Sequence, residues 1–399
     1  MKPKILVLSS SFPKYKGDIN GNFVYELCSR LINDFEIHVL VPFYKGALKF
    51  EEIEGIKIHR HKQSIFNKTE LAYGIGIYEN LKKNKLKYLV LPFYFFYLII
   101  SLIKIINKEK INICHAHWLI PNAFIAVLFK KVFCHDLKIL TTIHGSDLWG
   151  FDNALGNYLK KYTLKNINDL TVVSQPIKQR VISLGYKKEV YIYPMGVDTK
   201  LFSPGQKDDS LKKKLNINGF LLLFVGVVVE QKGIRFLIEA MPLILKKFPD
   251  TKLLVVGEGN LKNEMIELSK TLNISENIIF TGAISHVNLP PYFATADLFV
   301  LPSFSEGWPV VVMEALSSEA ITVVSNIDTF TKHKEKEKLF NIVETGNAND
   351  IANCVNIILA DKELILSKKA YLRKYAVEYF DWENIAAKYS LLIRNCMKR

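Results

Sequence analysis

Two glutamates, Glu306 and Glu314, are separated by seven residues and follow a buried-strand pattern at Leu298–Leu301. Glu306 and Gly307 stand in the loop after this strand, and Glu314 stands inside the helix predicted after Pro309. A carboxylate on that helix face can accept hydrogen bonds from ribose hydroxyls, and one ahead of the helix can reach a sugar. The pair predicts a nucleotide-sugar site; the alternative is two glutamates with no joint role.

Between the two glutamates the chain offers a place for phosphate. Pro309 suits the first position of a helix, where a missing N–H costs nothing. The free N–H groups of Val310, Val311 and Val312 are then expected to point into the crevice at the strand end. With the helix dipole behind them, these groups form a site for a pyrophosphate.

Strands must position these residues, and the chain alternates β-branched runs with amphipathic stretches. This pattern is typical of α/β layers with parallel sheets, which bind ligands at the carboxyl ends of their strands. The runs form two series, which predicts two Rossmann-like domains facing each other across a cleft. The first series is Lys4–Leu8, Glu36–Val41, Lys57–His59, Ile113–Ala116, Lys138–Ile143 and Asp169–Val173, and the second is Phe220–Val229, Lys252–Val256, Ile278–Thr281, Leu298–Leu301 and Ile321–Val324.

The interdomain linker and the cellular compartment can also be predicted. The Pro- and Gly-containing stretch Tyr193–Pro204 separates the two series and is the best linker. The N-terminal apolar run is short and ends at serines and Pro13, which indicates a first strand and not a secretory signal. The five cysteines are dispersed without a C-x-x-C pair, which argues against disulfides and zinc and suits a reducing, cytoplasmic compartment.

The spacing of the two glutamates, with LPS at 301–303 before them, resembles the glycosyltransferase group 1 family. These are glycogen-synthase-like retaining enzymes (family four) of the GT-B fold. The resemblance covers nearly the whole chain, and the order of the matching segments makes it specific. They are FP…GNF (12–23), HAHW (115–118), TIHGSD (142–147), PMGVD (194–198), FVG…QKG (224–233), VVGEGN (255–260) and FTGAI (280–284).

The resemblance implies roles for the matching residues. Lys232 is expected on the donor pyrophosphate, Glu314 at the ribose, and Glu306 at the donor sugar as a catalytic residue. The backbone of the phosphate loop and of the next strand end would hold the phosphates and the base. These backbone positions are Gly226, Gly282, Ala283 and Ile284.

The N-terminal half supplies two further expected residues. His144 would reach across the cleft to the sugar as a catalytic residue, and Gly21 would let the backbone approach the phosphates. A histidine at a strand end can also be purely structural, and His115 and His117 either line the acceptor side or pack beneath it.

The family's final helix crosses back to the first domain, and FDWENIAAKY (380–389) resembles it. The expected acceptor-side domain therefore covers residues 1–192 plus 378–399. The expected nucleotide-sugar-binding domain covers residues 199–377.

Two departures from the family pattern bear on the donor site. The family often has Arg after the glycine of FVG, and here Val227 stands at that position, with Gln231 or Arg235 as candidates to compensate. The family also often has a G-G-x-P-E segment after its glutamate pair. The corresponding stretch Ser325–Lys338 contains neither glycine nor proline.

No D-x-D-like metal motif stands at a predicted strand end, and the Asp208–Asp209 pair lies in a polar linker. Metal-independent transfer without a cofactor is expected, in which Lys232 and the helix N-terminus take up the charge of the leaving diphosphate. No convincing covalent nucleophile is present, and same-face attack would retain the anomeric configuration.

The net charge of +14 is distributed unevenly. Residues 1–190 hold 28 Lys and Arg against 15 Asp and Glu, whereas residues 191–399 hold 25 against 24. The basic half is expected to face an anion, either a membrane surface or nucleic acid. Nucleic acid is disfavoured because no recognition module accompanies the charge.

The apolar stretch Tyr88–Ile103 points to the membrane. It contains only Pro92 and Ser101 outside the apolar and aromatic set, and lysines flank both ends. It is short for a membrane span, which takes about 20 residues. A buried core helix and a full span remain alternatives, but the lysines and aromatic residues favour insertion at the interface. We expect a peripheral protein on the inner membrane face, with a saccharide or lipid-linked acceptor for polysaccharide or glycolipid synthesis.

Other classes of protein fit less well. A nicotinamide-dependent dehydrogenase needs G-x-G-x-x-G, and Gly257–Lys262 lacks the third glycine. A sugar-nucleotide epimerase leaves the lysine-flanked apolar stretch unexplained. A non-catalytic sugar-nucleotide or lipid-binding partner of an assembly pathway remains the alternative, because of Val227 and the 325–338 stretch.

Overall fold

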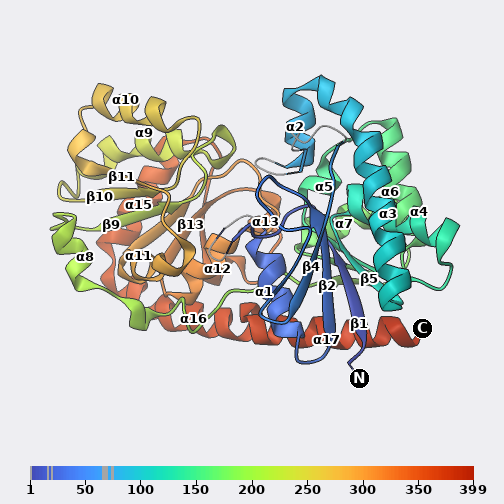
Figure 1. Cartoon of the computed structure of the whole chain (residues 1–399). Coiled ribbons are helices and arrows are strands. Elements are labelled where there is room, and N and C mark those ends of the chain that lie inside the picture. The colour runs from blue at the N-terminus through green and yellow to red at the C-terminus, as the bar shows by residue number, and fades with distance from the viewer. Residues whose placement is uncertain (1, 16–17, 19–20, 65–70, 73–75) are drawn as a thin grey trace. The chain divides into compact units, whose positions relative to one another are not determined.

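The computed structural model describes residues 2–15, 18, 21–64, 71–72 and 76–399, and it divides into two compact units (Figure 1). The first unit is Met1–Met195 with Ile385–Arg399, and the second is Gly196–Asn384. The division therefore falls between Met195 and Gly196, within the stretch expected to be a linker. The return to the first unit begins at Ile385, seven residues later than the expected start at 378.

The first unit is built on a sheet that has, among the described residues, eight strands in the order β3-β4-β2-β1-β5-β6-β7-β8. All neighbouring pairs are parallel except β3 and β4. The chain starts in the middle of this sheet and builds outward in both directions, so β1 and β5 form a topological switch point. The strands are β1 Lys4–Leu8, β2 Glu36–Pro42, β3 Phe50–Ile53, β4 Ile56–His61, β5 Ile113–His117, β6 Lys138–Ile143, β7 Asp169–Val172 and β8 Val190–Ile192.

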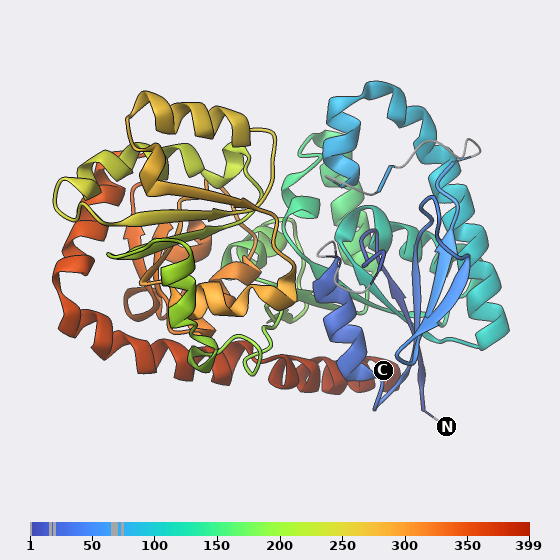
Figure 2. The same ribbon diagram turned by 60° about the vertical axis from the view of Figure 1, so that its left-hand side comes forward.

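Helices connect these strands, and β1, β2 and β5 are almost fully buried, as expected of a sheet covered on both faces. In Figures 1 and 2, α3 lies beside β2 and β4, with α4 next to it. The helices are α1 Asn22–Leu31, α2 Ile77–Lys83, η1 Lys85–Val90, α3 Leu91–Glu109, η2 Leu119–Ala123, α4 Phe124–Phe133, α5 Ser146–Trp149, α6 Ala154–Asn166, α7 Gln175–Ser183 and α17 Trp382–Lys398.

The second unit contains, in the described part of the chain, a six-stranded parallel sheet in the order β11-β10-β9-β12-β13-β14. Its switch point lies between β9 and β12. Because βαβ crossovers are right-handed, helices on the two sides of the switch point cover opposite faces. The strands are β9 Leu221–Val225, β10 Lys252–Val256, β11 Ile278–Gly282, β12 Leu298–Leu301, β13 Ile321–Ser325 and β14 Phe340–Val343.

Helix α9 packs against α15, and α12 packs against α16 (Figure 2). The expected strand Phe220–Val229 is shorter than predicted: β9 ends at Val225, and the residues after it form a loop. The helices of this unit are η3 Pro204–Gln206, α8 Asp209–Lys214, η4 Glu230–Lys232, α9 Ile234–Leu245, α10 Lys262–Thr271, η5 Ser275–Asn277, η6 His286–Asn288, α11 Pro290–Thr295, α12 Val310–Ser317, α13 Asp328–Thr331, α14 Lys336–Leu339, α15 Ala348–Ala360 and α16 Lys362–Phe380.

The last helix, α17, is anchored in the first unit by Tyr389. Its hydroxyl lies 3.3 Å from Thr142 Oγ1 and 3.2 Å from Thr171 Oγ1, and the side chain is fully buried. These threonines belong to β6 and β7. The C-terminal segment therefore completes the core of the first unit, in agreement with the resemblance of residues 380–389 to a returning helix.

The apolar stretch forms the helical segment Lys85–Glu109, which is long and apolar enough to cross a membrane by length and composition alone. Pro92 lies in the first turn of α3, where proline is tolerated, and does not break the helix. Only 28% of its most apolar window is buried, whereas a core helix of a soluble protein would be mostly buried. The buried side is Tyr94, Leu98, Leu102, Ile105 and Ile106, and the exposed apolar side chains are Leu86, Tyr88, Leu89, Phe93 and Phe96.

Candidate active site

The switch point of the second sheet brings together two loops that are far apart in sequence. Strands β9 and β12 are hydrogen-bonded neighbours, so their carboxyl ends lie at one edge of the sheet. Lys232 follows β9 and Glu306 follows β12. The sheet topology therefore places both of these predicted residues at the same strand ends.

Gly233 allows the two loops to approach closely. Its φ is +65°, and a Cβ atom there would lie 2.0 Å from the Pro302 carbonyl oxygen. A side chain at this position would push the turn that carries Lys232 away from β12. Gly233 is also the N-cap of α9, directly after Lys232.

Lys232 and Glu306 form an ion pair at this edge of the sheet. Lys232 Nζ lies 2.6 Å from Glu306 Oε1, and Ser303 Oγ donates a hydrogen bond of 2.7 Å to the same oxygen. The Glu306 side chain is 8% exposed and the Lys232 side chain is 20% exposed. A predicted catalytic residue and a predicted donor-binding residue are therefore in direct contact, and both are partly exposed to solvent.

Glu314 is paired with a residue that the sequence reasoning did not identify. His286 Nε2 lies 2.7 Å from Glu314 Oε1, and the Glu314 side chain is 2% exposed whereas His286 is 26% exposed. His286 follows the FTGAI segment, which is expected to hold the base. Its position in the sequence beside this predicted base site is the feature by which it could have been identified. This contact links the predicted ribose and base positions.

The first turn of α12 lies between the two glutamates as predicted, with one difference. The Val312 amide donates a 3.1 Å hydrogen bond to the Pro309 carbonyl oxygen, so it is not free as expected. Helix α12 begins at Val310, and the first amides of a helix lack partners within it. The prediction of a phosphate site therefore rests on Val310 and Val311, with Gly307 in the loop before them.

The remaining backbone positions lie on neighbouring strand ends. The Gly226 amide donates to the Val256 carbonyl at 3.0 Å, and the Gly282 carbonyl accepts from the Gly257 amide at 2.9 Å. Ala283 is exposed and Ile284 is half-buried, one residue further along. The hydrogen bonds of Gly226 and Gly282 thus connect the loops that follow β9, β10 and β11. The backbone of Ala283 and Ile284 lies beyond these bonds and is where a base is predicted to bind.

Neither of the two candidates, Gln231 and Arg235, supplies the cation that the family often has at position 227. The Val227 side chain is 52% exposed. Gln231 Nε2 donates to the Ser305 carbonyl at 2.9 Å, and Arg235 is ion-paired with Glu264. Lys232 is therefore the cation that the described phosphate loop directs to this site.

The segment 325–338 replaces the expected glycine-rich stretch with packed side chains. It forms the short helices α13 and α14, and Phe330 is fully buried. The Trp308 ring, next to Glu306 and Gly307, stacks on His333 with the ring centres 5.1 Å apart. Burial lowers the pKa of His333 to about 4, so it is neutral at physiological pH. Aromatic packing thus supports the glutamate-bearing loop.

In the first unit, His144 follows β6 and belongs to a histidine cluster. His117 Nδ1 lies 3.0 Å from His144 Nε2, and the two rings are stacked. Burial lowers the pKa of His144 to about 3 and that of His117 well below its usual range, so both are neutral. The nearby Asp147 accepts hydrogen bonds from the Leu119 and Gly145 amides, and burial raises its pKa to about 6.

His115 and His117 are fully buried, so they pack beneath His144 instead of lining an acceptor surface. His115 Nε2 lies 2.7 Å from Thr142 Oγ1. Gly21 has a φ of +71°, and a Cβ atom there would lie 2.5 Å from the Ser11 carbonyl carbon, so its own chain requires glycine. Residues 16–17 and 19–20 of the matching segment lie outside the described residues. The roles of Gly21 and His144 toward a donor stay predictions.

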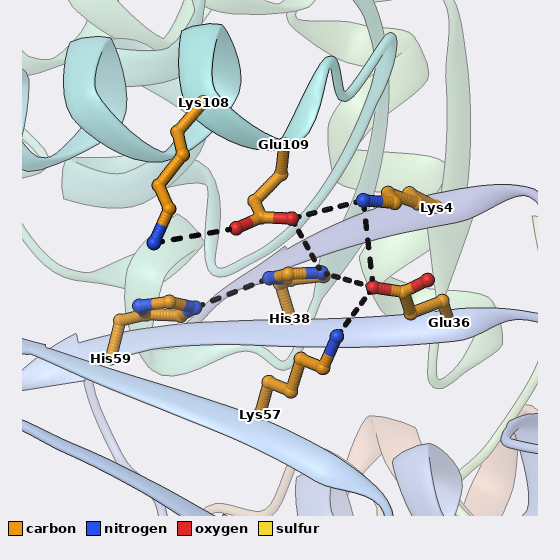
Figure 3. A network of polar contacts seen from close by, with 7 residues as sticks. All are labelled: Lys4, Glu36, His38, Lys57, His59, Lys108 and Glu109. Carbon is orange, nitrogen blue, oxygen red and sulfur yellow. Dashed lines mark hydrogen bonds and ion pairs between the residues drawn. The ribbon is translucent and has the colours of Figure 1, made fainter.

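One group in the described part of the chain has ligand atoms close enough for a metal ion: Glu36, His38 and Glu109 (Figure 3). Lysines already neutralise its carboxylates. Lys57 Nζ lies 2.7 Å from Glu36 Oε1, and Lys4 Nζ lies 2.9 Å from Glu109 Oε2. The hydrogen bond from Lys57 lowers the pKa of Glu36 to about 2. A cation would have to displace these ammonium groups, so we interpret the cluster as an ion-pair network.

Comparison with known proteins identifies the class. Residues 206–378 match the family model described as glycosyl transferases group 1, and residues 21–201 match glycosyltransferase family 4. The chain belongs to the glycosyltransferase group 1 family and has the GT-B fold.

Relatives and solved structures share this class at low sequence identity. The chain is 24% identical to an N-acetyl-alpha-D-glucosaminyl L-malate synthase of Bacillus anthracis, covering 74% of this chain and 77% of the relative. It is 28% identical to the UDP-Gal:alpha-D-GlcNAc-diphosphoundecaprenol alpha-1,3-galactosyltransferase of Escherichia coli, covering 68% and 72%. Its fold matches sucrose-phosphate synthase of Thermosynechococcus elongatus (TM-score 0.78, 18% identity, 99% of both chains) and Anabaena HepE in complex with UDP (TM-score 0.75, 14% identity, 98% and 100%).

Proposed function

We propose that this protein is a retaining glycosyltransferase that moves a hexose or N-acetylhexosamine from a nucleotide sugar to a saccharide or lipid-linked acceptor. The observation that carries the proposal is the contact between Lys232 and Glu306 at the switch point of the second sheet, with Glu314 in the second turn of the following helix α12. An ammonium group suits a diphosphate, and a neighbouring carboxylate suits a sugar hydroxyl and developing positive charge.

The proposed chemistry uses no metal or covalent intermediate. The bond between the anomeric carbon and the diphosphate oxygen breaks, and the diphosphate leaves with the electron pair. The acceptor hydroxyl attacks from the same face and passes its proton to a diphosphate oxygen. Lys232 and the first amides of α12 stabilise the charge that develops on the diphosphate. Glu306 stabilises the positive charge at the anomeric carbon, and the role of His144 toward the donor sugar stays a prediction.

Donor binding is proposed to involve the paired residue His286. In this arrangement Glu314 accepts a hydrogen bond from a ribose hydroxyl while His286 fixes the orientation of its carboxylate. The backbone of Ala283 and Ile284 binds the base. The HepE structure, named as a complex with UDP, makes a nucleoside diphosphate a reasonable probe of this site.

The acceptor is proposed to be lipid-linked and presented at the inner membrane face, in capsule, O-antigen or glycolipid synthesis. One relative is named for a diphosphoundecaprenol-linked acceptor. The basic first half supplies attraction to an anionic surface, and the exposed Leu86, Leu89, Phe93 and Phe96 supply apolar contact. Their spacing of three, four and three residues is that of one helix face.

A donor screen tests the proposal. The purified full chain is titrated calorimetrically with UDP-, GDP- and ADP-sugars, and with NAD as a control for the dehydrogenase class. Binding of one nucleotide-sugar family, with slow hydrolysis in the absence of acceptor, is the expected result. Binding without hydrolysis or transfer would support a non-catalytic sugar-nucleotide partner, the role to which the exposed Val227 points. Binding of none of the nucleotide sugars would refute the donor site.

A further inference from the structure

The Glu306 carboxylate has two donors on the same oxygen. Lys232 Nζ and Ser303 Oγ lie 2.6 Å and 2.7 Å from Oε1. Ser303 is fully buried at the end of the LPS segment, so its hydroxyl has little freedom to turn elsewhere. Among the described residues, both hydrogen bonds to this carboxylate go to Oε1. The arrangement leaves Oε2 for a ligand hydroxyl.

The backbone around Glu306 is held on both sides. The Phe304 amide donates to the Gln231 carbonyl at 2.8 Å, and the Gln231 side chain donates to the Ser305 carbonyl at 2.9 Å. Thr329 Oγ1 donates to the Glu306 carbonyl at 2.7 Å and is 6% exposed. Each residue from Ser303 to Glu306 therefore takes part in a hydrogen bond that fixes the loop.

A bound diphosphate would act differently on Lys232 and Ser303, the two hydrogen-bond donors to Glu306 Oε1. Lys232 has a flexible stem and three N–H donors, and a bound diphosphate would draw its ammonium group toward the phosphates. Ser303 has a short, uncharged and buried side chain, so a diphosphate attracts it much less than it attracts an ammonium group. When Lys232 turns to the phosphates, the hydrogen bond from Ser303 remains and keeps Glu306 from rotating.

We propose that Ser303 is a positioning residue that holds the Glu306 carboxylate toward the donor sugar while Lys232 is occupied by the diphosphate. This inference rests on the proposed function of the site and deepens it. It separates the binding of the diphosphate, which needs Lys232, from the recognition of the sugar, which needs an oriented Glu306. A purely structural serine would affect both equally.

The test compares Ser303→Ala with the wild-type chain. Two pairs of ligands are tried, UDP with UDP-glucose and GDP with GDP-mannose, and the comparison uses the pair that the wild-type chain binds. We expect the affinity of Ser303→Ala for the diphosphate to stay within about twofold, and its rate of nucleotide-sugar hydrolysis to fall by about tenfold or more. Ser303→Thr, which keeps the hydroxyl, should retain most of the rate. Ser317→Ala removes another buried hydroxyl, whose Oγ donates to the Phe202 carbonyl, and should leave both quantities unchanged.

Other outcomes separate the two proposals. Equal losses for the diphosphate and the nucleotide sugar, or an unchanged hydrolysis rate, would overturn the role of Ser303 while leaving the donor site in place. A wild-type chain that binds none of the UDP-, GDP- and ADP-sugars of the donor screen would refute the proposed function itself. If Ser303→Ala does not fold, Ser303→Cys keeps a similar volume with a weaker donor, and the same selective loss is expected.

Discussion

Lys232 Nζ and Glu306 Oε1 lie 2.6 Å apart although 74 residues separate them in the chain. The contact exists because β9 and β12 are adjacent and because Gly233 packs against the Pro302 carbonyl. In the free protein each charge therefore neutralises the other. Lys232 carries three N–H donors, so its ammonium group can also bind a diphosphate.

Replacing Lys232 with Met should weaken binding of the nucleoside diphosphate by about tenfold to a hundredfold, because the variant lacks the cation that faces the phosphates. The measurement is calorimetric titration with the diphosphate of the donor found in the screen. Lys270→Met removes an exposed lysine of α10 that pairs with Glu267, and should bind like the wild-type. Unchanged affinity in Lys232→Met would show that the phosphates bind elsewhere.

Replacing Val227 with Arg should strengthen diphosphate binding by about tenfold, since the exposed side chain stands at the phosphate loop and the candidate substitutes are engaged in other contacts. Ile357→Arg adds the same charge at an exposed position of α15 and controls for a general gain in attraction. Equal gains in the two variants would contradict a specific role for position 227.

The sequence predicted most of the central strands, and the three strands it missed each lie at the edge of a sheet. Strands β1, β6, β10 and β12 match their predicted bounds because buried parallel strands consist of continuous apolar runs. The missed strand β3 is a half-exposed edge strand with two glutamates. The missed strands β8 and β14 are short, with three and four residues, so neither presents a long apolar pattern.

For the site, residue types were predictable and contacts were not. Glu306, Glu314 and Lys232 could be selected because their motifs have a chemical meaning. The contacts of His286 with Glu314 and of Thr329 with the Glu306 carbonyl depend on how separate loops meet at the sheet edge. No pattern within either loop encodes that meeting.

Replacing the exposed apolar residues Leu86, Leu89, Phe93 and Phe96 with Ser should lower binding to vesicles containing phosphatidylglycerol by more than about tenfold. The measurement is co-sedimentation with vesicles at low salt, compared with pure phosphatidylcholine and with high salt, which screens the attraction. Leu155→Ser with Tyr158→Ser alters exposed apolar residues of α6 in the same unit and should not change binding. If the wild-type chain does not bind anionic vesicles, the membrane proposal is refuted.

Acid should destabilise the chain through its buried histidines, which outnumber Asp147, the buried carboxyl whose raised pKa acts in the opposite direction. Burial lowers the pKa of His61 from 6.5 to about 4, and those of His115 and His144 to about 3. Below pH 6.5 the unfolded chain binds protons that the folded chain does not, so the free energy of unfolding falls as the pH falls from 6.5 toward 4.

Thermal unfolding between pH 7 and pH 5 measures this effect. The decrease in Tm over this range should be smaller in His61→Asn, which keeps a donor for the Lys62 carbonyl, than in the wild-type. The same substitution at the exposed His135 should leave the decrease unchanged. An identical pH dependence in His61→Asn and the wild-type would contradict the assignment to buried histidines.

The most direct test of the central claim is the rate at which Glu306→Gln transfers or hydrolyses the identified nucleotide sugar, measured beside Glu337→Gln. Glutamine keeps the size of the side chain but cannot stabilise positive charge at the anomeric carbon. The rate of Glu306→Gln should therefore fall by about a hundredfold or more, with diphosphate affinity and Tm close to those of the wild-type. Glu337 is exposed on α14, and its variant should turn over normally. Near-normal turnover in Glu306→Gln would contradict the account.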